Sequence, residues 1–188
     1  ISKEIKGPVQ VIWTREDDTV MGPFRPGMVY KCSGGLNEDG RITAYKFKMA
    51  GQNMDHQWPG ASKDSYNGST TEGFLESYFD SIPHFSFSDS PLLSPIPVMW
   101  WRSVYSSTNG FAYESFMDEL AVAAGKDPLE FRRQHLGEER YHLLIDKLSE
   151  VSGWKSREKN EGASAGASSK LGFPAGASAK VGYGVAIT

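Results

Sequence analysis

Residues 98–134 read VMWWRSVYSSTNGFAYESFMDELAVAAGKDPLEFRRQ, and this stretch decides the second half of the fold. From Thr108 onward the apolar side chains recur with the period of an amphipathic helix. They fall on one face: Phe111, Phe116, Met117, Leu120 and Ala124. Gly125 ends this helix, because glycine is the residue most often found just past a helix C-terminus. The pattern predicts a helix from about residue 108 to residue 125.

Two further helices are predicted downstream of it. The run DPLE carries a helix-start pattern, with Asp127 as the cap, Pro128 in the first turn and Glu130 reaching back to the cap. This short helix stops near Gly137. The third helix, over residues 138–152, ends at the glycine that follows it. Its apolar positions lie at helical spacing: Tyr141, Leu144, Ile145, Leu148 and Val151.

The first half of the chain is strand-like. Residues 8–16, PVQVIWTRE, alternate apolar positions and predict a half-buried strand. A hairpin follows within residues 28–51, where MVYKCSGGL and RITAYKFKMAG flank a turn at Asp39-Gly40.

These elements predict an α+β fold, with an antiparallel hairpin or small sheet in the first part and three helices from about 108 to 152. Between the two parts, residues 53–73 are polar and predict a long loop or a partly helical excursion. Residues 78–99 contain prolines at positions 83, 91, 95 and 97. Proline excludes one long helix there, so we expect short extended pieces.

Residues 158–180 differ in composition from the rest of the chain. GASA occurs twice there and GAS a third time, which is typical of a flexible linker or an insertion. We therefore divide the chain into a body over 1–157, this linker, and the start of a further strand over 181–188. Because the first residues, ISKEIKG, resemble the last turns of a helix, we expect the chain to be a fragment of a larger protein.

Charge and composition exclude several classes. The formal net charge of −3 gives no electrostatic footprint for nucleic acid. No apolar run approaches the roughly 18–20 residues of a membrane span. The single cysteine, Cys32, excludes an internal disulfide and an iron–sulfur cluster held by this chain alone, and its place in a predicted strand indicates an inert thiol. The four histidines show no metal-ligand spacing, so no metal site is predicted.

Arg102 is the candidate site residue. It lies between the Trp100-Trp101 pair and the start of the predicted helix, where a semi-buried guanidinium needs a partner. Two interpretations remain open. Arg102 either forms a structural ion pair or holds an anion near the amino end of the helix, which attracts negative charge.

The carboxylates of that helix are interpreted as a solvated face or as partners for arginines, rather than as an acid/base pair. The carboxylates are those of Glu114, Asp118 and Glu119, and the arginines are Arg102, Arg132 and Arg133.

Several stretches together resemble the large subunit of the molybdenum hydroxylases, the xanthine dehydrogenase and aldehyde oxidase family. They are PVQVIWTREDD followed by FRPG, the hairpin with DGRITAYK, and WWRSVYSSTNGFAYESFMDELAVAAGKDPLEFRRQHL. The resemblance covers most of residues 1–157 and resumes at GYGVAIT. It is strongest to the branch of the isoquinoline 1-oxidoreductase beta chain. Where the family usually has Arg-Gly-Phe-Gly or Arg-Ala-Pro-Gly, this chain has RSVYSS.

The resemblance implies a mixed α/β molybdopterin-binding domain, a molybdopterin cofactor in the parent protein, and hydroxylation of an N-heterocycle or aldehyde with oxygen from water. Arg102 matches the arginine that the family places close to the pyranopterin, and no catalytic residue is implied within this chain. The family's GGGFG-type loop and its glutamate base are expected before Ile1 and beyond Thr188. The implied partners are the remainder of the large subunit and an iron–sulfur small subunit.

Two functional hypotheses follow. The chain is a fragment of a molybdopterin-dependent oxidoreductase, inactive and without bound cofactor by itself, or it is a non-catalytic binding or scaffolding module that retains the fold. In the isolated fragment, Arg102 is expected to bind Glu114 or Asp118, or to stack on Trp100 or Trp101.

Overall fold

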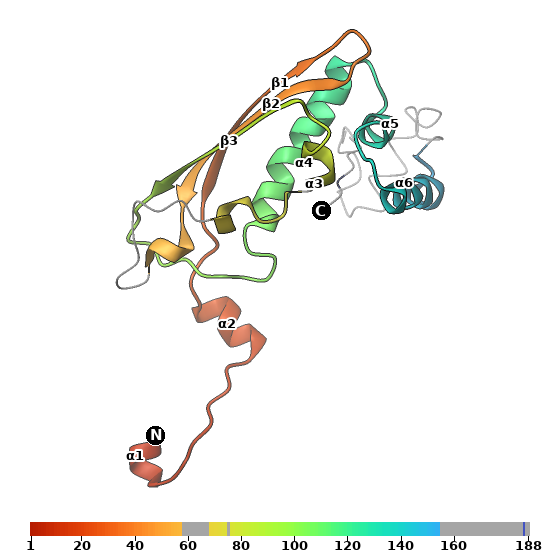
Figure 1. The fold of residues 1–188 in the computed structure, drawn as a ribbon. Helices are drawn as coiled ribbons and strands as arrows, with labels where there is room; N and C mark the ends of the chain where they lie inside the picture. The colour runs from red at the N-terminus through yellow and green to blue at the C-terminus, as the bar shows by residue number, and fades with distance from the viewer. Residues whose placement is uncertain (58–67, 75, 155–185, 187–188) are drawn as a thin grey trace, which may run out of the picture.

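The computed structural model describes residues 1–57, 68–74, 76–154 and 186 (Figure 1). The elements in chain order are α1 (Ser2–Ile5), α2 (Arg15–Met21), β1 (Met28–Leu36), β2 (Ile42–Gln52), the 3-10 helices η1 (Met54–Gln57) and η2 (Gly68–Thr71), α3 (Glu76–Phe79), β3 (His84–Leu92), α4 (Ser106–Ala123), α5 (Pro128–Arg133) and α6 (Glu139–Ser152). A curved sheet is covered on one face by α4, with α5 and α6 beside one end of that helix. The predicted α+β fold with three C-terminal helices is confirmed.

The predicted hairpin is also confirmed, since β1 and β2 pair antiparallel along their lengths. In the turn, Gly40 has a φ of 68°, a left-handed conformation that glycine adopts without a steric cost. The Asn37 side chain accepts a hydrogen bond from the backbone N–H of Arg41 at 2.8 Å, which closes the turn.

The third strand makes the sheet mixed rather than antiparallel throughout. β3 pairs with β2 in parallel, starting with His84 opposite Ala44, and the strand order is β1-β2-β3. The extended pieces predicted within 78–99 therefore include a strand of nine residues. Pro91 is tolerated in it because β3 lies at an edge of the sheet, where a missing N–H breaks no ladder.

The connection between β2 and β3 contains η1 and η2, so the helical excursion predicted within 53–73 is confirmed for its described part. The linker predicted over 158–180 lies outside the described residues. The strand predicted over 181–188 also lies outside them, apart from residue 186.

The core lies between the sheet and α4. Alternate side chains of β2 face the helix, and Tyr45 and Phe47 are buried there against Tyr113 and Met117. The ring of Phe74 lies between the two layers, with its centroid 4.7 Å from that of Phe47 and 5.4 Å from that of Tyr113. Full burial of side chains of this size contributes about 1.5–3 kcal/mol each, so this aromatic cluster is a large apolar contribution to the fold.

Helix α4 presents most of its predicted face to the core: Met117 and Leu120 are buried, and Phe116 and Ala124 pack against the core cluster. Phe111 was expected in the core and is 75% exposed, whereas Tyr113 is fully buried. The helix lies so close to β1 at Gly34 that any larger residue would clash there. A Cβ atom added to Gly34 would lie 2.9 Å from the Leu120 side chain. The close approach of helix and strand involves Leu120, a predicted core position, whereas periodicity alone did not show that Phe111 is exposed and Tyr113 buried.

Helix α6 follows its predicted boundaries, whereas α5 ends at Arg133, before the predicted stop near Gly137. The Asp127 carboxylate accepts hydrogen bonds from two backbone N–H groups in the first turn of α5. Glu130 lies with its carboxylate 3.9 Å from Arg133. Helix α6 ends at Gly153, and its buried residue is Ile145. Three other predicted core positions of α6 are at least 36% exposed: Leu144, Leu148 and Val151.

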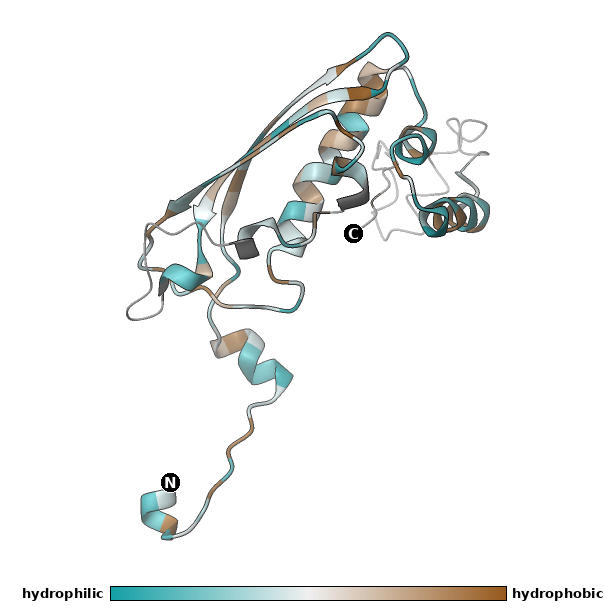
Figure 2. Ribbon diagram, viewed as in Figure 1, coloured by the Kyte–Doolittle hydropathy of each residue, from teal (hydrophilic) through white to brown (hydrophobic). Residues whose placement is uncertain are grey.

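The strand predicted over residues 8–16 is wrong. Residues 8–13 pair with no strand in the described part of the chain, and Trp13 is 63% exposed. The Thr14 hydroxyl accepts a hydrogen bond from the Asp17 N–H at 3.2 Å, and the Asp17 carboxylate accepts one from the Thr14 N–H at 3.0 Å. This capping box starts α2 and ends the alternating pattern. The segment before α2 projects from the sheet with hydrophobic residues along it (Figure 2).

Arg132 is fully buried and joins α5 to α4. Its Nε donates to the Glu114 carboxylate at 2.8 Å, and its Nη1 donates to the Asp118 carboxylate at 2.6 Å. Burial by itself would lower the pKa of Arg132, but the two carboxylates outweigh burial and raise it, so the guanidinium stays charged. The interpretation of these carboxylates as partners for arginines is confirmed, and the arginine is Arg132.

His135 joins the end of α5 to β2. Its Nε2 accepts a hydrogen bond from the Ile42 N–H at 3.0 Å, and its Nδ1 lies 2.8 Å from the Phe131 carbonyl oxygen. A neutral ring with its proton on Nδ1 satisfies both contacts. Burial lowers the pKa of His135 and favours this neutral form.

Replacing Arg132 with methionine is expected to lower the free energy of unfolding by about 3–5 kcal/mol, because the Glu114 carboxylate would stay buried without its counter-charge. Urea unfolding followed by tryptophan fluorescence measures the change. The control is Arg133→Met, which removes contacts with the exposed Asp146 and Glu130. It should cost less than about 1 kcal/mol. Equal losses in the two variants would contradict the role given to Arg132.

Acidification below about pH 6.5, the ordinary pKa of histidine, is expected to destabilise the fold through His135. In that range the unfolded chain binds a proton that the folded His135 resists, so the free energy of unfolding falls as the pH falls. His135→Gln should flatten this part of the pH dependence, measured by urea unfolding at a series of pH values. His84→Gln, at an exposed position, should keep the wild-type slope. An unaltered slope in His135→Gln would refute the assignment.

Candidate functional site

The turn that carries Arg102 is held from two directions. The Trp101 indole Nε1 donates to the Pro23 carbonyl at 2.7 Å. The Arg25 guanidinium donates to the Arg102 carbonyl at 2.8 Å and to the Ser107 hydroxyl at 3.0 Å. These bonds fix the backbone of the turn while the Arg102 side chain remains exposed.

Tyr105 anchors the same turn in the interior. Its ring is fully buried in a small cluster with Met54 and Val98, and its hydroxyl accepts a hydrogen bond from the Met54 N–H at 3.0 Å. Burial raises the pKa of Tyr105 to about 12, so the hydroxyl stays protonated at neutral pH. Tyr105 therefore has a structural role.

Arg102 lines a pocket of about 160 Å³ between α2 and the turn. Helix α2 contributes Arg15 and Asp18, and the guanidinium carbon of Arg15 lies over the Trp101 ring at 5.2 Å from its centroid. This distance is typical of a cation–π contact. The remaining lining residues are Gly22, Pro23, Met99 and Trp100. Two arginines, one aspartate and two tryptophans thus line one small cavity.

Arg102 does not have the partners expected for an isolated fragment. Glu114 and Asp118 both bind Arg132, and the arginine that lies over Trp101 is Arg15. The expected pairing with Glu114 or Asp118 is wrong because Arg132, eighteen residues from Glu114 along the chain, reaches the two carboxylates from α5. Within the described part of the chain, no hydrogen bond or ion pair of the Arg102 side chain is recorded.

The backbone after Arg102 is left-handed at two successive residues. Ser103 has a φ of 73° and Val104 a φ of 40°. For residues with a Cβ this conformation is unfavourable by about 1–2 kcal/mol, and it is least compatible with a β-branched side chain. Ser103 occupies the position of the first glycine in the Arg-Gly-Phe-Gly form noted above. The bonds from Trp101 and Arg25 hold the turn in this conformation.

The other sequence candidates are structural. Burial raises the pKa of the Cys32 thiol to about 11, with a smaller effect of Glu119. The thiol is therefore protonated at neutral pH, which favours the interpretation of Cys32 as an inert thiol. Among the described residues, no group of three or more histidine, cysteine or acidic side chains could hold a metal ion. In the same part of the chain, no helix is both long and apolar enough to cross a bilayer.

Sequence reasoning missed Arg15, Asp18 and Arg25. Arg25 meets the Arg102 carbonyl across 77 residues of chain, and no local pattern indicates such a contact. The Thr-x-x-Asp capping pattern that starts at Thr14 could have placed Arg15 at the start of a helix. It could not have placed that helix beside the turn.

The residues that line this pocket fall within a match to a known protein family. The model of the molybdopterin cofactor-binding domain matches residues 1–136, a range that includes Arg15, Asp18 and Arg102. The chain belongs to the molybdopterin cofactor-binding domain family. This membership confirms the resemblance to the molybdenum hydroxylases, and the residues that line the pocket lie within the matched range.

Relatives of this molybdopterin-binding domain chain include three named proteins. It is 30% identical to a nicotinate dehydrogenase subunit of Pseudomonas putida over 82% of this chain and 14% of that protein. It is 28% identical to the isoquinoline 1-oxidoreductase beta chain of Brevundimonas diminuta, over 92% of this chain and 22% of that protein. It is also 28% identical to a membrane-bound, pyrroloquinoline-quinone aldehyde dehydrogenase of Gluconacetobacter polyoxogenes, over 72% of this chain and 18% of that protein. The chain thus spans less than a quarter of each relative.

Ser103→Gly is expected to raise the free energy of unfolding by about 0.5–1 kcal/mol. Glycine removes the Cβ clash of the left-handed conformation, and its larger loss of backbone entropy offsets part of the gain. The matched change Ser149→Gly, in the interior of α6, should instead lower the free energy of unfolding by about 0.5 kcal/mol. Urea unfolding compares the two. A destabilised Ser103→Gly protein would show that the turn stores no such strain.

Proposed function

We propose that this chain contributes to a molybdenum-dependent oxidoreductase that hydroxylates an N-heterocycle or an aldehyde with oxygen from water, and that α2 and the Arg102 turn form one wall of its molybdopterin site. The observation that carries the proposal is the exposed Arg102 guanidinium in a pocket with Arg15, inside the segment that matches the molybdopterin-binding family.

The chemistry of the pocket fits the polar parts of molybdopterin. The guanidinium groups of Arg15 and Arg102 are donors suited to a phosphate group or to a pterin carbonyl. The carboxylate of Asp18 is an acceptor suited to the N–H groups of a pterin ring. A volume of about 160 Å³ takes a phosphate or a single ring and not the whole cofactor. We therefore expect other parts of the protein to hold the rest.

Each residue has a defined task in this proposal. Arg102 and Arg15 bind and orient the anionic or carbonyl group, while Trp100 and Trp101 exclude water from it, which strengthens hydrogen bonds from charged donors. Arg25 keeps the turn that carries Arg102 in place. The cofactor, when bound, supplies the oxidation and reduction chemistry. The general base is expected elsewhere in the protein.

The substrate class is inferred from the named relatives. Nicotinate and isoquinoline, in the names of two of them, are both N-heterocycles, whereas the third is named for an aldehyde. An N-heterocycle is therefore the favoured substrate. The first two relatives are also named as subunits, which supports an assembly of several chains. We propose the remainder of the large subunit and an iron–sulfur small subunit as partners, the latter to carry electrons away.

Arg102→Ala in the complete protein is expected to weaken cofactor retention by about tenfold or more, because each lost charge-assisted hydrogen bond is worth about 1.5–3 kcal/mol. Molybdenum by mass spectrometry and pterin by fluorescence after release measure the occupancy, independently of turnover. The melting temperature of the cofactor-free protein should change little, because the Arg102 side chain is exposed. Arg140→Ala removes another exposed arginine, beside Tyr141 in α6, and should keep full occupancy.

Three outcomes would contradict the proposal. An Arg102→Ala protein that melts far lower yet binds cofactor fully when folded would make Arg102 structural. Equal loss of cofactor in the Arg102 and Arg140 variants would remove the specific role of the pocket. A wild-type protein that carries pyrroloquinoline quinone, or neither cofactor, would favour the quinone chemistry named for the third relative or a non-catalytic scaffolding module.

A further inference from the structure

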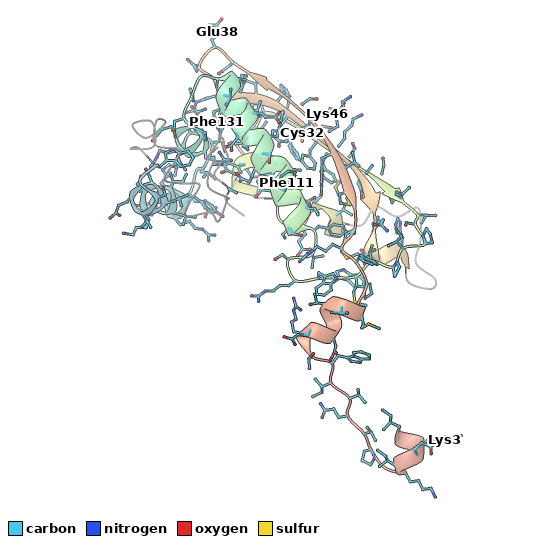
Figure 3. The ribbon with its side chains drawn as sticks, turned by 180° about the vertical axis from the view of Figure 1, so that it is seen from behind. Lys3, Cys32, Glu38, Lys46, Phe111 and Phe131 are labelled. Atoms are coloured by element: carbon cyan, nitrogen blue, oxygen red, sulfur yellow. The ribbon has the colours of Figure 1, made fainter. Side chains whose placement is uncertain are left out.

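The face of the sheet that points away from α4 is basic. Lys31 of β1 and Lys46 and Lys48 of β2 are exposed on it, and Figure 3 shows Lys46 projecting from this side. The outward positions of β3 are also exposed: His84, Ser86, Ser88, Ser90 and the apolar Leu92. Val29 is an exposed apolar residue at an outward position of β1. No acidic side chain occupies an outward position on the described strands. The chain as a whole has a net charge of −3, so overall composition does not explain this concentration of lysines.

The strand register brings the lysines close together. Lys31 lies directly opposite Lys48, and Lys46 is the next outward residue along β2. Side chains directly opposite in a sheet have Cβ atoms about 4.5–5.5 Å apart, and like charges at such positions are destabilising. A surface that needed only solubility would mix the two signs of charge. The arrangement is therefore the one expected where a negatively charged partner neutralises the face.

A hollow next to Lys46 gives this face a shape as well as a charge. Its volume is about 440 Å³, and the side chains on either side of Lys46 in register are the hydroxyls of Ser33 and Ser86. Gly34, Gly35 and Ala44 contribute only small groups to its lining, which also includes Tyr45, His84 and Phe85. A carboxylate that entered the hollow would meet one ammonium group and two hydroxyl donors.

We propose that this face docks an extended acidic segment of a separate polypeptide chain, with its carboxylates at alternate positions. Lys46 and Lys48 lie two residues apart on one strand, about 6.6–6.8 Å, which is also the spacing of alternate side chains in an extended partner. One carboxylate enters the hollow beside Lys46, and the next lies between Lys48 and Lys31. Nucleic acid fits less well, because His84 is the single outward aromatic side chain on the described strands on which a base could stack. This inference is independent of the proposed function.

The test is the binding of labelled peptides to the complete protein, measured by fluorescence anisotropy at low salt. A peptide of alternating glutamate and serine should bind about threefold to tenfold more tightly than a peptide of the same composition with all its glutamates in one block. Added salt should weaken the binding. Lys48→Glu and Lys46→Gln should each weaken it by a similar factor. Lys3→Glu, which makes a charge change in the remote helix α1, should not.

The folding of Lys48→Glu is checked by its melting temperature, which should not fall, because the new carboxylate faces Lys31 across the strands. Equal affinity for the alternating and block peptides would show that the face attracts negative charge without regard to its spacing, and would overturn the proposal. Equal weakening by Lys3→Glu would also overturn it, as would tighter binding of an oligothymidylate of the same charge. Absence of peptide binding in wild type would overturn it outright.

Discussion

The buried guanidinium of Arg132 is the interaction on which the rest of the structure depends. It neutralises the buried carboxylate of Glu114 and joins α5 to α4, the helix against which the sheet packs. A buried ion pair of this kind contributes modestly to net stability, but the loss of one partner is costly. The same guanidinium also forms an ion pair with the Asp118 carboxylate. Neither carboxylate is then left to neutralise Arg102.

This division of charges explains how one chain has both an enclosed and an exposed arginine close to α4. Arg132 is surrounded by carboxylates and carbonyls, and its charge is satisfied inside the protein. Arg102 lies at the start of α4, on a turn held rigid by Arg25 and Tyr105, and shares its pocket with Arg15. A fixed backbone with an exposed guanidinium is the arrangement that binding of an anionic group requires, because little order is then lost on binding.

The two faces of the sheet also differ in the side chains that they carry. The aromatic side chains of β2 face α4 and form the core, while the lysines of β1 and β2 face outward. The alternation of a strand produces this separation directly, since successive side chains point to opposite faces. The pocket of Arg102 and the basic face are thus separate surfaces, one bounded by α2 and the other by the strands. They can be altered independently by mutation.

The sequence by itself determined the hairpin, the three C-terminal helices and the family, because Asp39-Gly40, Asp127-Pro128 and the periodic helix positions act through neighbouring residues. It also indicated Arg102. Local pattern indicated most of the buried face of α4 but not its limits, since Phe111 is exposed and Tyr113 is buried. Nor could it choose among three arginines for Glu114, or bring Arg15 to Trp101. These contacts join residues far apart in the chain, and only packing in three dimensions fixes their distances.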